Sequence, residues 1–445
     1  MVVRYYVIAF FLSVLIALLG TMNVDIALTL SLLIFVYNLF FVASLNDGKL
    51  ISLTIGFALL LPGLSFPIDI SNDFFLISDR LRVYHIFLYP LLMKIIVRGF
   101  LRNQKSGTGL LLMIFIYIFY HIYTENVLSL FQLFIDVIYV TALPFIFYLN
   151  VDKKYAIKTI KKILPYFAIF TIFDILISYT GLVPWTISYR NGIQGVFHAH
   201  ELPYSISVLV LIAYFLELKL KNKFTYMFMF LISAVVLFST QIKSTVFALS
   251  LMFAIWFFEV FKIKTTKLHI IAGILLIIIA VPYFDSLVSR IGTVFIYMYA
   301  YINGNIIFGI APGFLSYEMK ANLSEVFAQK YSYLLAPLMS IDSKYLLESQ
   351  LRLSYSDRVD AFMAHNVFIA FMVSFGMYSF IVFKMIYKRY KNVKIHNFKY
   401  LFLALIAMMF LHTKSFLLEA TVIIFLNIYN NESNNISRRT RYKTH

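Results

Sequence analysis

Apolar residues occur in long runs along this chain, and short polar or basic segments separate the runs. Most runs are about 17–25 residues long, the length that a helix needs to cross roughly 30 Å of bilayer hydrocarbon. They lack the alternation of polar and apolar positions that is typical of a membrane β-barrel, so we predict helices. The predicted spans are 4–20, 24–43, 50–66, 81–97, 109–123, 128–149, 163–180, 202–218, 224–239, 244–261, 268–284, 361–383, 397–412 and 416–430.

These runs predict an all-α fold, a polytopic transmembrane helical bundle of about 14 spans, with a range of about 11–14. Two segments between spans form substantial loops, and both fall on the outer side when the spans alternate. The longer loop is expected to hold short helices, for example near 342–358. The predicted regions are N-terminal transmembrane helices at 1–180, a first outer loop at 181–201, central transmembrane helices at 202–284, a large outer loop at 285–360, C-terminal transmembrane helices at 361–430 and a cytoplasmic tail at 431–445.

The composition excludes a water-soluble globular protein. Of the 445 residues, 61% are hydrophobic and 13% are charged, whereas soluble domains carry about 25% charged residues. The chain contains no cysteine, which excludes disulfides, thiolate metal sites and cysteine nucleophiles. A second apolar run follows the first without a small-residue cleavage site, so we interpret the first run as an uncleaved span rather than a signal peptide.

The net charge of +17 reflects membrane topology rather than a surface for nucleic acid. When the first residue is placed in the cytoplasm and the spans alternate, most of the 38 Lys and Arg residues fall on cytoplasmic segments. This distribution satisfies the positive-inside rule. We therefore expect both termini in the cytoplasm, the lipid bilayer as a partner and no nucleic-acid partner.

Polar residues that could carry chemistry gather on the outer side of the predicted bundle, in the loops and at the ends of the spans. They form a series of short motifs in which a basic residue or a histidine stands beside glycine, serine or proline. In chain order, the motifs are Arg190 with Gly195 and Pro203, Lys243 in the turn 240–244, Ser289 with Arg290, the segment 308–314 with Gly309 and Gly313, and Ala364, His365 and Asn366 with Gly376.

In this order and on this side, the motifs resemble those of the bacterial O-antigen polymerase and O-antigen ligase family of polytopic membrane glycosyltransferases. The resemblance covers residues 180–385, and the Ala-His-Asn run followed by a glycine is its most specific part. Lys243 stands where the family usually has Arg. A lysine binds phosphate as a single point charge, so two-point binding is not expected there.

The resemblance implies transfer of a glycan from an undecaprenyl diphosphate carrier to an acceptor hydroxyl, at the periplasmic face of the bacterial inner membrane. The diphosphate leaves more readily when Arg side chains neutralise its charge, and a neutral His can accept the hydroxyl proton near physiological pH. No metal and no cofactor are expected. The candidate site residues are His365 as general base, Arg190 and Arg290 on the diphosphate, Lys243, Arg80 and Arg82 as supporting cations, and Asn366 and His200 on the substrate.

The candidates also have purely structural interpretations. The arginines are suited to anchor the chain at the membrane interface, and His365 to form a backbone hydrogen bond at the start of a helix. His200 belongs to the polar run 198–201, which has too few ligands for a metal site. Asp136 and Asp174 lie within spans, where we expect structural hydrogen bonds inside the bundle.

Three functions remain open from the sequence. A polymerase would join lipid-linked repeat units, and a ligase would move finished glycan onto lipid A-core. We favour the polymerase because the number of spans and the size of the large outer loop suit it better. Such a polymerase is expected to work with a chain-length regulator. The alternative from another class is a flippase or transporter of lipid-linked glycans, although transporters usually show repeated halves and a site at the bilayer midplane.

Overall fold

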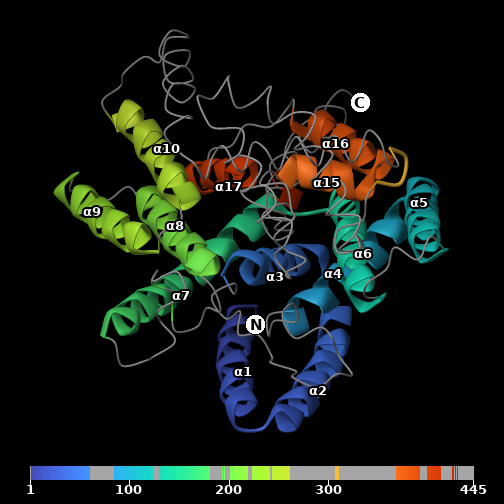
Figure 1. Ribbon diagram of the computed structural model, residues 1–445, viewed down its shortest axis with the longest axis horizontal. Coiled ribbons are helices and arrows are strands. Elements are labelled where there is room, and N and C mark those ends of the chain that lie inside the picture. The colour runs from blue at the N-terminus through green and yellow to red at the C-terminus, as the bar shows by residue number, and fades with distance from the viewer. Residues whose placement is uncertain are drawn as a thin grey trace, which may run out of the picture.

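The computed structural model of the chain describes residues 2–60, 85–123, 130–180, 193, 195, 201–218, 223–240, 243–260, 306–309, 367–390, 398–411, 423, 424, 426 and 428. Every regular element in these residues is a helix (Figure 1). The helices are α1 (Val2–Met22), α2 (Val24–Ala43), α3 (Asp47–Leu60), α4 (His85–Arg102), α5 (Gln104–Tyr123), α6 (Leu130–Ile146), α7 (Lys153–Thr180), α8 (Glu201–Glu217), α9 (Lys223–Ser239), α10 (Lys243–Val260), α15 (Val367–Phe375), α16 (Met377–Tyr390) and α17 (Lys399–Leu411).

Asparagine and aspartate side chains set the starts of several helices. Asn23 caps α2 by accepting hydrogen bonds from the backbone N–H groups of Asp25 and Ile26, at 3.0 and 3.2 Å. Asn46 accepts the N–H of Lys49 at the start of α3, at 3.0 Å. Such caps satisfy donors that have no partner inside the helix. They allow short, sharp turns between neighbouring antiparallel helices.

The predicted spans agree with the helices over most of the described chain. Each span predicted between residues 4 and 261 overlaps a helix. The span 268–284 lies outside the described residues, and residues 423, 424, 426 and 428 of the span 416–430 are helical. The helix suggested near 342–358 also lies outside the described residues.

The helix that contains the predicted span 163–180 is longer than the span, because α7 begins ten residues earlier at Lys153. The basic residues that we assigned to a cytoplasmic loop form the first turns of this 28-residue helix. Asp152 caps it by accepting the N–H of Lys154 at 2.9 Å. A helix of this length extends about 42 Å, so its basic turns reach beyond the hydrocarbon. Lysine is also a good helix former.

The prediction of one continuous helical span at 361–383 was wrong within residues 367–383, the part of it that the structure describes. The chain forms two helices there, α15 and α16, and Gly376 separates them with a positive φ of 51°. The sequence around Gly376 is apolar on both sides, so hydropathy alone does not detect the break.

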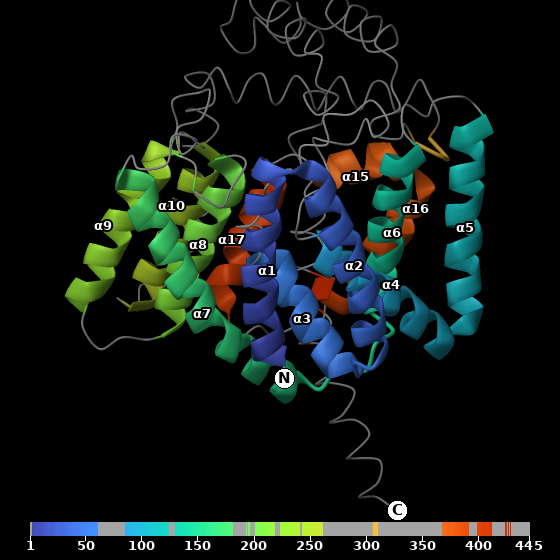
Figure 2. The same ribbon diagram turned by 90° about the horizontal axis from the view of Figure 1, so that it is seen from below.

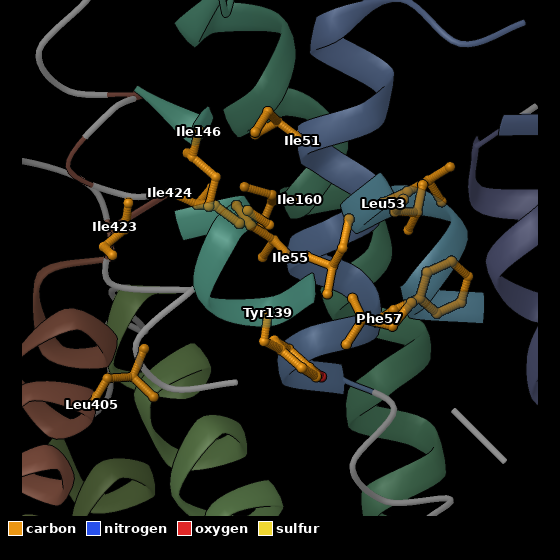
Figure 3. Packing of buried hydrophobic residues seen from close by; sticks show 14 of the residues in the cluster. Ile51, Leu53, Ile55, Phe57, Tyr139, Ile146, Ile160, Leu405, Ile423 and Ile424 are labelled. Atoms are coloured by element: carbon orange, nitrogen blue, oxygen red, sulfur yellow. The ribbon is translucent and has the colours of Figure 1, made fainter. Parts of the chain in front are cut away.

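Helix α3 is the centre of the hydrophobic core. Every residue from 50 to 57 is buried, and α1, α4, α7 and α8 all pack against this helix. Figure 3 shows Ile51 and Ile55 of α3 near Ile146 of α6 and Ile160 of α7. The hydroxyl of Ser52 donates to the carbonyl of Gly48 at 2.7 Å. Its polar group is therefore satisfied within the helix, as burial requires.

The outer surface of the bundle is apolar, in contrast to a soluble protein. Large hydrophobic side chains on α1, α2, α5, α7 and α9 point away from the core. They include Phe11, Leu33, Phe40, Phe115, Phe119, Leu176, Phe228 and Val235. Among the described helices, α2 from Asp25, α5 and α7 are long and apolar enough to cross a membrane. The described part of the chain is therefore that of a helical membrane protein.

Basic helix ends lie together at one edge of the bundle. In Figure 2, the first turns of α1, α5 and α7 and the last turn of α4 lie along the lower edge. Asp47, the first residue of α3, links the end of α4 to the segment that precedes α7. It forms an ion pair with Arg102 at 2.8 Å and accepts the N–H of Asn150 at 3.0 Å. The basic residues of these helix ends are Arg4, Arg98, Arg102, Lys105, Lys153, Lys154 and Lys158.

A second charged contact ties α17 to α10. Glu259 in the last turn of α10 forms an ion pair with Lys399, the first residue of α17. The same carboxylate accepts a hydrogen bond from the hydroxyl of Tyr400 at 2.7 Å. A carboxylate at the start of a helix also interacts favourably with the helix dipole. This contact aligns the ends of two helices that lie far apart in the sequence.

The close contact between α4 and α6 is open to a direct test, because Gly99 allows it. A Cβ atom on Gly99 would lie 2.8 Å from both the Cβ and the carbonyl oxygen of Phe145. We expect Gly99→Ala to destabilise the protein by about 1–3 kcal/mol through overpacking. Gly109→Ala is the matched control, since nothing lies within 4 Å of its added methyl group. The measurement is the free energy of unfolding of both purified variants in detergent. Equal stabilities of the two variants would contradict this packing.

Candidate functional site

The described residues include little of the predicted site itself. Lys243 is the first residue of α10, and its side chain is not among those described. The other candidates lie outside the described residues, namely Arg80, Arg82, Arg190, His200, Arg290, His365 and Asn366. Their convergence on one cavity stays a prediction. The described neighbours of these residues do, however, show which motif-bearing segments lie side by side.

The first outer loop contacts the turn between α9 and α10. The N–H of Ile193, three residues after Arg190, donates to the carbonyl of Ser239 at 2.9 Å. Ser239 is the last residue of α9, and α10 begins four residues later at Lys243. This backbone bond joins the Arg190 motif to the Lys243 motif, although about 50 residues separate them in the sequence.

The end of α7 joins the same contact through side chains. Ser239 donates its hydroxyl to the carbonyl of Val236 at 2.6 Å. Its oxygen is then left as the acceptor for the hydroxyl of Tyr179, 2.5 Å away on α7. Three segments, the first outer loop, α7 and α9, are therefore connected through Ser239. We call this set the Ser239 contact.

A buried polar group lies close to the Ser239 contact, between α7 and α8. Asp174 on α7 is only 2% exposed, and Tyr204 on α8 is fully buried. The Tyr204 side chain lies beside Asp174, Ser178 and Tyr179. A carboxyl group within a span is costly unless other polar groups of the protein surround it. Asp174 therefore faces protein, as we expected, whereas the Asp136 side chain lies outside the described residues.

A second contact brings Gly309 of the segment 308–314 next to Gly376 of the His365 motif. Residues 306–309 pack against the break between α15 and α16, where the N–H of Met377 donates to the carbonyl of Ile307 at 2.9 Å. The ring of Phe308 stacks on Tyr120 of α5, with ring centroids 4.3 Å apart. The start of the motif 308–314 and Gly376, which ends the His365 motif, are therefore neighbours.

The two contacts lie on the same side of the bundle but not at the same place. In Figures 1 and 2, α9 and α10 lie toward one end of the long axis, and residues 306–309, drawn in gold, lie toward the other end beside α5. Helix α15, which begins two residues after His365, lies between them. Both contacts are on the side opposite the basic helix ends (Figure 2).

Several of these contact residues were missed by sequence reasoning. Tyr204 and Ser178 lie within apolar spans, as do Tyr117 and His121 on α5. A polar side chain in an apolar run is the only signal that could have indicated them. That signal does not say which helix the polar group faces, so it does not group these residues.

No metal site can be built from the described residues. Among the parts of the chain that the structure describes, no group of three or more His, Asp or Glu side chains could hold a metal ion. Metal-independent chemistry stays a prediction, because most of the outer loops lie outside those parts.

No protein-family model, no curated protein and no solved structure matches this chain. The motif series is therefore a resemblance rather than an assignment. The class that the fold defines is a helical membrane protein with two contacts between motif-bearing segments on one side.

The Ser239 contact predicts energetic coupling between α7 and α9. We expect Tyr179→Phe and Ser239→Ala to be non-additive by about 0.6 kcal/mol, the average for hydrogen bonds between membrane helices. A double-mutant cycle, measured by unfolding in mixed micelles, gives this energy. Tyr166→Phe, a tyrosine of similar exposure on the same helix, is the control and should show no coupling with Ser239→Ala. Strict additivity of the Tyr179 pair would show that the hydrogen bond is absent.

Proposed function

We propose that this chain is an O-antigen polymerase of the bacterial inner membrane. In this proposal the chain crosses the membrane about 14 times, and both termini lie in the cytoplasm. It joins undecaprenyl-diphosphate-linked oligosaccharide repeat units at the periplasmic face, without a metal or a cofactor. The substrates are lipid-linked glycans, and a chain-length regulator is an expected partner.

The observation that carries the proposal is the pairing of the motifs. The Arg190 loop contacts the Lys243 turn through Ile193 and Ser239. Gly309, in the first part of the segment 308–314, lies beside Gly376, the last residue of the His365 motif, and the N–H of Met377 donates to the carbonyl of Ile307 next to them. Each pair of segments meets in space, both pairs lie on one side of the bundle, and α15, which begins two residues after the candidate base His365, lies between them (Figures 1 and 2). The motifs are separated by many residues in sequence, so chance adjacency is a weaker explanation.

The proposed chemistry is a displacement at the anomeric carbon of the lipid-linked donor. The oxygen of the acceptor hydroxyl forms a new bond to that carbon, and the bond from the carbon to the diphosphate oxygen breaks. The hydroxyl proton passes to the imidazole of His365 as general base. Undecaprenyl diphosphate leaves with the bonding electrons, and Arg190 and Arg290 stabilise its negative charge.

The spacing of the two contacts favours a polymerase over a transporter. A transporter usually binds its substrate near the bilayer midplane, between repeated halves. Here the motif-bearing segments lie on one side, and they extend along the long axis of the bundle (Figure 2). An extended outer surface suits two lipid-linked glycans, a donor and an acceptor, bound side by side.

Substitution of the general base or of a diphosphate-binding arginine tests the reaction. We expect His365→Ala or Arg290→Ala to abolish chain extension by removing proton transfer or charge stabilisation, while membrane insertion stays normal. The measurement is the ladder of glycan lengths extracted from cells, at matched protein levels. Lys158→Ala, an exposed lysine in the first turns of α7, is the control and should retain the full ladder. Full-length glycan in both site variants would contradict the proposed reaction.

Deletion of the gene separates the two glycosyltransferase functions in the same assay. Loss of a polymerase should leave lipid A-core that carries one repeat unit. Lipid A-core with no repeat unit at all would instead identify a ligase.

The proposed orientation can be tested on the two ends of a single helix. The chain has no cysteine, so single cysteines can be introduced without background. We expect a membrane-impermeant maleimide to label Tyr123→Cys, at the end of α5, in intact spheroplasts. Lys105→Cys, at the start of the same helix, should react only after permeabilisation, because positive residues are retained in the cytoplasm. The reverse pattern would invert the proposed topology.

A further inference from the structure

The break between α15 and α16 leaves backbone groups that the outer loop satisfies. The N–H of Gly376 donates to the carbonyl of Met372 at 2.9 Å, so the last turn of α15 is intact. In a continuous helix the next N–H, that of Met377, would donate to the carbonyl four residues earlier. It donates instead to the carbonyl of Ile307 at 2.9 Å. Residues 306–309 therefore replace a lost helical hydrogen bond inside an apolar bundle, where an unpaired N–H is costly.

Only glycine permits this approach. Gly376 has a φ of 51°, and Gly309 has a φ of 76°, values that residues with a Cβ atom rarely adopt. A Cβ atom on Gly376 would overlap the carbonyl oxygen of Ile307 and lie 2.7 Å from the backbone nitrogen of Gly309. The two glycines face each other across the contact, and a larger residue at position 376 would push residues 306–309 away.

Helix α5 holds the same contact from its other side. The hydroxyl of Tyr117 donates to the carbonyl of Ser374 at 3.0 Å, and so satisfies an acceptor near the end of α15. The ring of Tyr120 stacks on Phe308 at an interplanar angle of 16°. The ring nitrogen Nε2 of His121 lies 3.5 Å from the carbonyl of Phe308. Both views show residues 306–309 between α5 and the pair α15 and α16 (Figures 1 and 2).

We propose that residues 306–309, Gly376 and the outer turns of α5 form a latch that positions the start of α15 for glycan transfer. Helix α15 has nine residues and is about 13.5 Å long. It also packs against α16 and α17, so holding its end at Gly376 restricts where its start at Val367 can lie. His365 and Asn366 immediately precede that start. Gly309, Gly376 and Tyr120 are positioning residues in this proposal, whose catalytic meaning rests on the proposed function.

The latch itself is tested without any assay of activity. In the cysteine-free chain, Ile307→Cys and Met377→Cys place two thiols at residues joined by a backbone hydrogen bond. Disulfides form when the Cα atoms are about 5.5–6 Å apart. We expect efficient crosslinking of this pair in membranes under mild oxidation. The addition of Gly376→Ala should reduce the yield strongly, whereas the addition of Gly109→Ala should not. Equal yields in both backgrounds would overturn the latch.

The role of the latch in transfer is tested on the rate of repeat-unit incorporation. We expect Gly376→Ala and Tyr120→Ala to slow chain extension by about 10- to 100-fold, since misplacement of a reacting group by about 1 Å has effects of this size. Tyr120→Phe keeps the stacked ring and should restore the rate. Gly99→Ala, which strains the α4 and α6 contact instead, should leave chain extension unchanged at matched protein level.

The outcomes distinguish a failed latch from a failed function. Lost crosslinking with normal chain extension in Gly376→Ala would overturn the positioning role. Equal loss of extension in Tyr120→Phe and Tyr120→Ala would do the same, because the ring stack would then not matter. If gene deletion leaves the glycan ladder intact, the proposed function fails and the positioning role fails with it, whereas the crosslinking result still decides whether the latch exists.

Discussion

Hydrocarbon does not solvate charges or unpaired backbone groups, and this constraint accounts for most of the arrangement of the helices. The basic turns of α7 extend past the apolar part of the helix, and the ends of α4 and α5 carry Arg102 and Lys105 at the same edge. Asp47 is buried at that edge only because Arg102 and the N–H of Asn150 surround it. Large apolar side chains are exposed on the described faces of α1, α2, α5, α7 and α9, as expected where the solvent is lipid.

The same constraint explains why the functional segments meet through backbone hydrogen bonds. Where a helix stops inside the bundle, its free N–H and carbonyl groups need partners, and the outer segments provide them. The N–H of Met377 finds the carbonyl of Ile307, and the carbonyl of Ser239 finds the N–H of Ile193. A backbone N–H or carbonyl that is not exposed to water needs such a partner wherever regular helix ends. The helix ends and breaks therefore occur where loop segments supply the missing hydrogen-bond partners.

Much of the fold could be predicted from the sequence, because hydropathy and charge report directly on the lipid solvent. The spans up to residue 261 overlap the helices, but the start of α7 and the break at Gly376 were missed. Both features were missed for the same reason. Hydropathy indicates which residues are apolar enough to face lipid, whereas the start and the end of a helix depend on backbone hydrogen bonds. The candidate site was predictable only as separate motifs. Asp174 could be recognised as a buried group, but its neighbour Tyr204 could not, because the partner depends on how α7 packs on α8.

The sequence by itself determined that this is a helical membrane protein, which segments of it are basic, and the order of its motifs. These properties are local, since each depends on the transfer of one segment between water and lipid. The tertiary structure decided which motifs meet, that the Arg190 loop contacts the end of α9 and that Gly309 faces Gly376. Such pairings depend on shape and on the absence of a Cβ atom at one position. Neither hydropathy nor charge predicts these pairings. In lipid, packing and interhelical hydrogen bonds decide which helices become neighbours.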